Sequence, residues 1–100
     1  MDEVRDYTKA LEIRPFEGFI YNNRVVIYDK SGQIDLALDD YNRAIMLNSR
    51  ESIFYKNRSN LLFKIGNFEQ AARYLARSRF WDIQKMQQKK NGNQEGQSEF

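Results

Sequence analysis

Cysteine and histidine are both missing from the 100-residue sequence. Without cysteine there is no disulfide framework, no thiolate nucleophile and no zinc–thiolate site. Without histidine there is no imidazole base, no Ser–His relay and no common zinc or haem ligand. The remaining reactive groups are carboxylates, lysines, tyrosines and serines, so most familiar hydrolase and metalloenzyme designs are excluded. We therefore predict that the protein is not an enzyme and that it binds no cofactor and no metal ion.

Helix breakers and long apolar runs are also scarce. Proline occurs once, at Pro15, and glycine five times, so the chain can build long helices. No stretch approaches the roughly 18 apolar residues of a membrane span, and residues 1–6 are polar and acidic, unlike a secretory signal peptide. The composition, 41% apolar and 30% charged, is typical of a soluble globular or repeat protein. The absence of cysteine does not fix the compartment; the cytoplasm is the default expectation, with the nucleus as the alternative, and no membrane partner is expected.

The net charge of +2 is distributed unevenly along the chain. Residues 1–50 hold seven Lys and Arg against nine Asp and Glu, whereas residues 51–100 hold nine against five. Basic residues interleaved with aromatic ones near the C-terminus could stack bases and contact phosphates. The run is sparse and Glu69 and Asp82 lie within it, so an acidic protein partner or a solvated surface is favoured over nucleic acid. The run comprises Arg73, Tyr74, Arg77, Arg79, Phe80, Trp81, Lys85, Lys89 and Lys90.

The sequence repeats itself after 34 residues. A displacement of 34 aligns seven identical pairs without a gap, against roughly two expected from average residue usage. The chain therefore contains two copies of one unit, residues 18–51 and residues 52–85. The identical pairs are Tyr21 and Tyr55, Asn23 and Asn57, Arg24 and Arg58, Lys30 and Lys64, Gly32 and Gly66, Ala37 and Ala71, and Arg43 and Arg77.

Each unit has the periodicity of two helices. Apolar residues recur at helical spacing from Ile34 to Tyr41, and the second copy repeats this phase from Phe68. Another helical pattern precedes the glycine of each unit, Gly32 or Gly66. Glycine can adopt the positive φ that ends the first helix. The sequence thus predicts an all-α chain of antiparallel helix pairs.

A 34-residue helix–turn–helix unit with these residues resembles the tetratricopeptide repeat (TPR). In that family an aromatic residue lies near the start of the first helix, glycine lies at the turn, and alanine lies early in the second helix. The resemblance covers about residues 1–85 and implies an α-solenoid whose first helices line a concave, partner-binding face. The matching positions read Tyr21, Val25, Gly32, Ala37, Tyr41 and Ala44, and then Tyr55, Ser59, Gly66, Ala71, Leu75 and Ser78.

Both ends depart from the repeat. Residues 1–17 resemble half a unit, a second helix with its linker. Ile83 replaces the family's proline, so the last helix can run on, and residues 86–90 are predicted to extend it as a capping helix. Residues 91–100 lack apolar periodicity and are predicted to form a mobile tail. Because such units bury their cores only in arrays of about three, the sequence favours either a longer array or a covering subunit.

Two repeated asparagines are candidates for binding a partner. Asn23 and Asn57 share one position of successive units, opposite the core positions of their helices. An amide both donates and accepts hydrogen bonds, so two such side chains in a row could hold a peptide backbone. The alternative is that these amides bond locally or to water.

Four more residues complete the candidate site. Lys56 and Asn60 match two members of the carboxylate clamp of chaperone-binding TPR domains. The rest of that clamp would lie in a following repeat, so a solvated pair is favoured. Phe63 and Phe19 are expected on the same face as apolar anchors for a partner. The alternative for Phe63 is packing under the C-terminal helix.

Two arginines and three aspartates have structural interpretations. Arg24 and Arg58 fall within the core positions, where we expect each to lay its stem over apolar neighbours and to pair with a carboxylate. Asp35, Asp39 and Asp40 suggest a catalytic group, but acidic residues near a helix N-terminus are the ordinary explanation.

Three functions follow from these patterns. The first is a non-catalytic interaction module that binds a peptide or helix on its concave face. The second is a structural subunit that docks, or self-associates, through exposed terminal helices. The third is nucleic-acid binding through the basic C-terminal helix.

Overall fold

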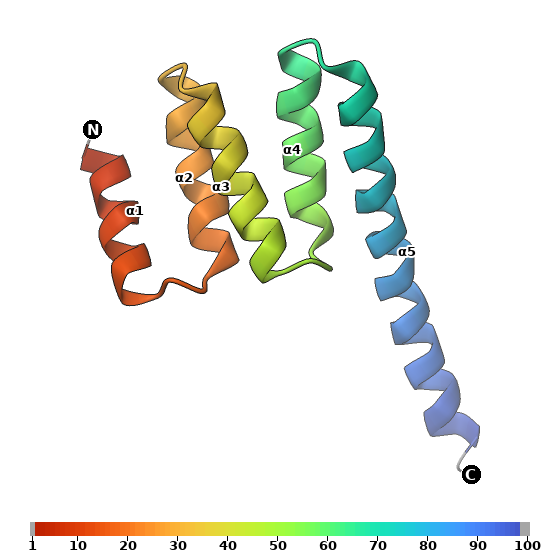
Figure 1. Ribbon diagram of the computed structural model, residues 1–100. Coiled ribbons are helices and arrows are strands. Elements are labelled where there is room, and N and C mark those ends of the chain that lie inside the picture. Colours follow the sequence, from red (N-terminus) through yellow and green to blue (C-terminus); the bar gives the residue numbers. More distant parts are fainter. Residues whose placement is uncertain (1, 99–100) are drawn as a thin grey trace.

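The computed structural model describes residues 2–98, and side chains from Glu3 to Lys89, as a row of five helices (Figure 1). Each helix packs antiparallel against the next one along the chain. The prediction of an all-α stack of helix pairs is confirmed. The helices are α1 (Asp2–Ile13), α2 (Gly18–Lys30), α3 (Ile34–Leu47), α4 (Ser52–Lys64) and α5 (Phe68–Ser98).

The two predicted units have matching backbones. The first helices α2 and α4 contain 13 residues each and begin 34 residues apart. Gly32 and Gly66 take the positive φ values of 75° and 87° that end these helices. The same turn hydrogen bonds surround both glycines: Gly32 N–H donates to Asp29 O, and Gly66 N–H donates to Phe63 O, both at 3.0 Å. Glycine occupies this position because it adopts positive φ without a steric penalty.

The linkers between units also recur, and they define the role of α1. Arg14 N–H donates to Ala10 O at 2.8 Å, just as Asn48 N–H donates to Ala44 O at 2.9 Å. The Tyr55 hydroxyl donates to Ser49 O in the preceding linker, and the equivalent Tyr21 hydroxyl donates to Pro15 O. Since α1 ends in the same way as α3, it occupies the place of a second helix.

The core joins one unit to the next. Val25 from α2, Ala37 and Tyr41 from α3, and Leu61 from α4 form one buried cluster. Leu61 is 4% exposed, so a side chain of the second unit completes the core of the first. Within the second unit, Phe54 is fully buried. Most of this burial depends on contacts between helices, as expected for a solenoid.

Helix α5 is longer than the sequence predicts. It continues to Ser98 and projects beyond the other helices (Figure 1), whereas we expect the helical part to end near Lys90. It contains no proline, and each glycine inside a helix costs only about 1 kcal/mol, so nothing in its sequence forces a break. The predicted capping segment is therefore continuous with the second helix of its unit. The predicted mobility of residues 91–100 stays a prediction.

Candidate partner-binding surfaces

The first helices of the two units are linked directly to each other. Asn57 of α4 donates from Nδ2 to Oδ1 of Asn22 at 3.2 Å. Lys64 of α4 forms an ion pair with Asp29 of α2 at 3.1 Å. These bonds hold α2 and α4 side by side, so their exposed surfaces form one face, which we call the first-helix face.

A polar cavity lies between α2 and α4. It has a volume of about 170 Å³, and we call it the α2–α4 cavity. Burial, and secondarily the charge of Asp29, raises the pKa of Tyr41 to about 12, so its phenol is neutral and can donate a hydrogen bond at physiological pH. Ammonium and phenol donors thus lie beside carboxylate and amide acceptors. The cavity is lined by Asp29, Tyr41, Asn57, Asn60, Leu61 and Lys64.

The candidate asparagines do not share one environment. Asn23 and Asn60 are exposed on α2 and α4. Asn57 is half-buried and already bonded to Asn22. The two equivalent amides therefore differ: Asn57 bonds to the neighbouring helix α2, whereas Asn23 is exposed to solvent. Asn60 and Asn57 are brought together at the α2–α4 cavity.

The two candidate phenylalanines are separated. Phe19 lies at the start of α2 and meets the ring of Phe54 edge-on, with centroids 4.7 Å apart. Phe63 lies near the end of α4 and meets Phe68 in the same way at 5.1 Å. Since α2 and α4 run in the same direction (Figure 1), the two rings lie toward opposite ends of the helices. The two rings therefore do not lie next to each other, and their role as anchors for a partner stays a prediction.

Phe63 instead lines an apolar cavity between α4 and α5 of the second unit. Lys56 is exposed on the same helix, α4. Phe63 is 65% exposed, so it packs only partly against α5. The cavity has a volume of about 280 Å³, and we call it the edge cavity. It is lined by Ser59, Phe63, Phe68, Ala71, Ala72 and Leu75.

Arg24 pairs with a carboxylate as predicted. Its guanidinium donates two hydrogen bonds of 2.7 Å to the fully buried Asp40, and a third of 3.2 Å to Thr8 of α1. Arg43 adds a further bond to Asp40 at 3.0 Å. The bidentate bond to Asp40 raises the pKa of Arg24, so this ion pair stays charged.

Contrary to the prediction, no carboxylate of the described residues pairs with Arg58. The position equivalent to Asp40 is Tyr74, whose ring lies 4.3 Å from the guanidinium carbon. Arg58 donates to Oδ1 of Asn42 at 3.0 Å, while its buried Nη1 has no hydrogen-bond partner among the described residues. Burial lowers the pKa of Arg58 because no anion compensates the loss of water. A repeated arginine thus forms an ion pair in one unit and a cation–π contact in the other.

This difference predicts that the same substitution has a large effect in one unit and a small effect in the other. Arg24→Met removes charged hydrogen bonds from Asp40 and should lower the free energy of unfolding by about 2 kcal/mol. Arg58→Met replaces a poorly compensated buried charge with an apolar chain and should change it by less than about 1 kcal/mol. Urea denaturation of both variants measures the difference. Equal losses would contradict this account of Arg58.

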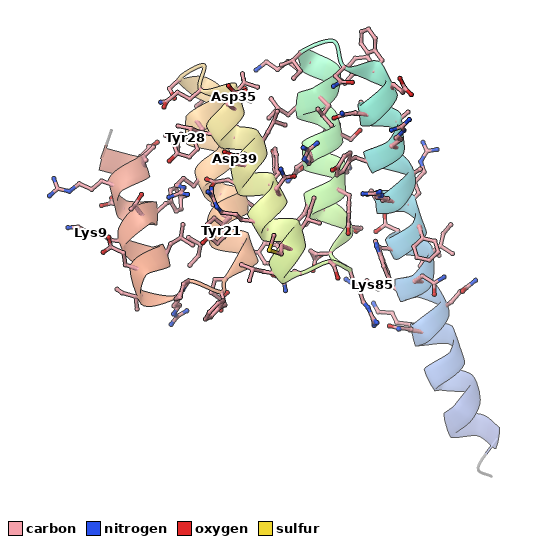
Figure 2. The ribbon with its side chains drawn as sticks, in the orientation of Figure 1. Lys9, Tyr21, Tyr28, Asp35, Asp39 and Lys85 are labelled. Atoms are coloured by element: carbon pink, nitrogen blue, oxygen red, sulfur yellow. The ribbon has the colours of Figure 1, made fainter. Side chains whose placement is uncertain are left out.

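The other candidate chemistry has no geometric basis. Asp40 is fully buried in its ion pair, whereas Asp35 and Asp39 are exposed on α3 (Figure 2), so the three carboxylates form no common site. Within the described part of the chain, no three potential ligands are grouped to hold a metal ion. Among the helices of the described residues, none is long and apolar enough to cross a membrane.

The sequence patterns missed one further cavity. It has a volume of about 430 Å³ and lies between the α3–α4 linker and α5. Arg50 lies over the ring of Trp81 at 5.7 Å, and the Ser52 hydroxyl donates to Asp82 at 2.6 Å. Lys85 lines the same cavity and is visible on α5 in Figure 2. These residues lie about one unit apart at non-equivalent positions, so the repeat contains no signal for their contact.

Comparison with known proteins agrees with the helix arrangement. Residues 20–51 match the family model described as tetratricopeptide repeat. No curated protein matches the sequence. The chain superposes on the structure titled "Crystal structure of MamA" with a TM-score of 0.79 at 17% identity, covering 84% of this chain and 49% of that one. For "MamA MSR-1 C2" the TM-score is 0.75 at 21% identity, covering 82% and 47%.

The chain thus spans about half the length of these two structures. At such identities the likeness concerns the fold. The 34-residue spacing, the paired glycine turns and the family match all describe the same unit. Residues 20–51 thus match a tetratricopeptide repeat, and the chain has a TPR-like fold in which a single helix precedes two helix pairs.

Proposed function

We propose that the protein is a non-catalytic interaction module that binds a peptide or helix on its first-helix face. The observation that carries the proposal is the α2–α4 cavity, where donors and acceptors of two units converge. The cross-repeat bonds from Asn57 and Lys64 hold these groups in place before a partner arrives. Preorganised polar groups reduce the ordering cost of binding.

Asn60 lines the α2–α4 cavity, and Asn23 lies next to Asn22 on α2. Both side chains are exposed and carry a donor and an acceptor. They can therefore bond to peptide backbone groups without selecting a particular side chain. Phe19, 47% exposed and supported by Phe54, offers an apolar contact at the start of α2.

The alternative functions have weaker support. Nucleic-acid binding would rely on the basic run of α5, but Arg73 pairs with Glu69 at 2.8 Å and Arg77 lies over Tyr74 at 5.3 Å. These internal contacts leave fewer free cations for phosphates. A structural role through the terminal helices remains a second proposal, supported by the exposed Ile83 and Met86 on α5.

Selection of displayed random peptides on the full chain tests the main proposal. A selected peptide should bind the Asn23→Ala, Asn60→Ala double variant about tenfold more weakly, because two hydrogen bonds are worth about 1 kcal/mol each or slightly less. Fluorescence anisotropy measures the affinity, and circular dichroism verifies that the helices persist.

The matched control removes two exposed polar side chains from second helices. Asp39→Ala combined with Gln70→Ala should leave the affinity unchanged, since both side chains are exposed on α3 and α5. If the control weakens binding as much as the test variant, or if neither weakens it, the first-helix face is not the binding site.

A further inference from the structure

The edge cavity of the second unit has a filled counterpart in the first. The residues that lie 34 positions before its lining are Val25, Asp29, Ile34, Ala37, Leu38 and Tyr41. In the first unit Val25, Ala37 and Tyr41 are closed over by Leu61 of α4. In the second unit no described residue takes the place of Leu61, and a cavity of about 280 Å³ remains. The first unit therefore shows what kind of element fits the edge cavity: an α-helix that presents a leucine.

The chain itself does not supply that helix within residues 2–98. Helix α5 runs straight to Ser98 and does not turn back along α4 (Figure 1). The residue 34 positions after Leu61 is Glu95, which lies on α5 and is acidic. An acidic residue cannot replace a leucine in an apolar cavity without a large desolvation cost.

Residues beside the cavity define the chemistry of the incoming helix. In the first unit Asn22 accepts from Asn57, and Asp29 pairs with Lys64, one on each side of Leu61. The equivalent residues at the free edge are Lys56 in place of Asn22 and Phe63 in place of Asp29. An incoming helix therefore needs an anionic residue to pair with Lys56, at the position by which Asn57 contacts Asn22. It needs an apolar residue to cover Phe63, at the position by which Lys64 contacts Asp29.

We propose that this edge binds an amphipathic helix of another protein, laid parallel to α4, that carries a carboxylate, a leucine four residues later and an apolar residue three residues after that. The spacing is that of Asn57, Leu61 and Lys64, which puts all three side chains on one face of a helix. The leucine enters the edge cavity, the apolar residue covers the exposed ring of Phe63, and the carboxylate pairs with Lys56.

Charge complementarity favours an acidic helix over a neutral one. Lys56 is exposed, and residues 51–100 carry nine basic against five acidic residues. This excess attracts an acidic segment and speeds its encounter. The edge cavity shares no lining residue with the α2–α4 cavity, so the proposal stands independently of the function proposed above.

A synthetic peptide with this pattern on a Glu-, Gln- and Ala-rich helical background is the probe. Binding to the full chain is measured by fluorescence anisotropy, and we expect replacement of the peptide leucine by alanine to weaken it about tenfold or more. Lys56→Glu in the chain should weaken it about fivefold, and a peptide with lysine in place of the carboxylate should recover that loss on the variant. The compensating exchange distinguishes a direct pair from a general charge effect.

Lys9→Glu provides the control, because it makes the same charge change on the distant helix α1 (Figure 2) and should leave affinity unchanged. The Asn23→Ala, Asn60→Ala variant should also bind normally, which separates this edge from the first-helix face. The proposal is overturned if the peptide fails to bind, or if the leucine and Lys56 exchanges have no effect. It is also overturned if the chain alone forms a dimer that Phe63→Glu dissociates, since a second copy would then occupy the edge.

Discussion

Replacement of Asp40 by alanine is expected to lower the free energy of unfolding by about 3–5 kcal/mol. The carboxylate is fully buried and accepts bonds from Arg24 and Arg43. Without it, the Arg24 guanidinium, whose side chain is only 12% exposed, loses its anion and much of its hydrogen bonding. A buried charge that has lost its partner cannot recover full hydration, so most of the desolvation cost becomes destabilisation.

The adjacent residue Asp39 is the control for this substitution. It is exposed on the same helix, and Asp39→Ala should change stability by less than about 0.5 kcal/mol. Urea denaturation followed by circular dichroism measures both. A loss for Asp40→Ala no larger than that for Asp39→Ala would show that the buried ion pair contributes nothing net to folding.

Replacement of Phe54 by alanine should cost about 3–5 kcal/mol. The side chain is fully buried, and its ring contacts Phe19 of the preceding unit at 4.7 Å. The substitution removes an aromatic ring from the junction between two units and leaves a cavity that the surrounding helices fill only in part. Since total stability is commonly about 5–15 kcal/mol, this loss would bring the protein close to unfolding.

Phe63→Ala is the matched control, because the same side chain is removed from the same helix at a position that is 65% exposed. We expect a loss below about 1 kcal/mol, chiefly from the contact with Phe68. Thermal and urea denaturation give the two values. Similar losses for both variants would contradict the packing described for the unit junction.

Local regularities were predictable because they depend on residues close together in the chain. Helical spacing identified the core positions Ala37, Tyr41 and Ala71, and all three are buried. Gly32 and Gly66 take the expected positive φ, since a turn's conformation depends on the steric freedom of one residue. The length of α5 was not predicted, because two glycines weaken a helix without breaking it.

The candidate site was predicted only as a set of residue types. Equivalent positions in the repeat suggested equivalent roles for Asn23 and Asn57, and for Arg24 and Arg58. The structure separates them, because the neighbours of each member differ: Asn57 has Asn22 beside it, and Arg58 has Tyr74 where Arg24 has a carboxylate. A contact depends on both residues, and a repeated residue in the sequence does not require its neighbour in space to be repeated as well.

The absence of cysteine and histidine led to the prediction of a protein that holds partners and performs no chemistry. Composition and the 34-residue spacing were sufficient for the fold class, the unit boundaries and the turns, since these follow from short-range sterics and periodic burial. Which polar groups meet in the α2–α4 cavity, and the edge cavity that has no counterpart of Leu61 to fill it, depended on how whole helices pack. Packing brings together residues from different units, and their separation along the chain carries no information about that contact.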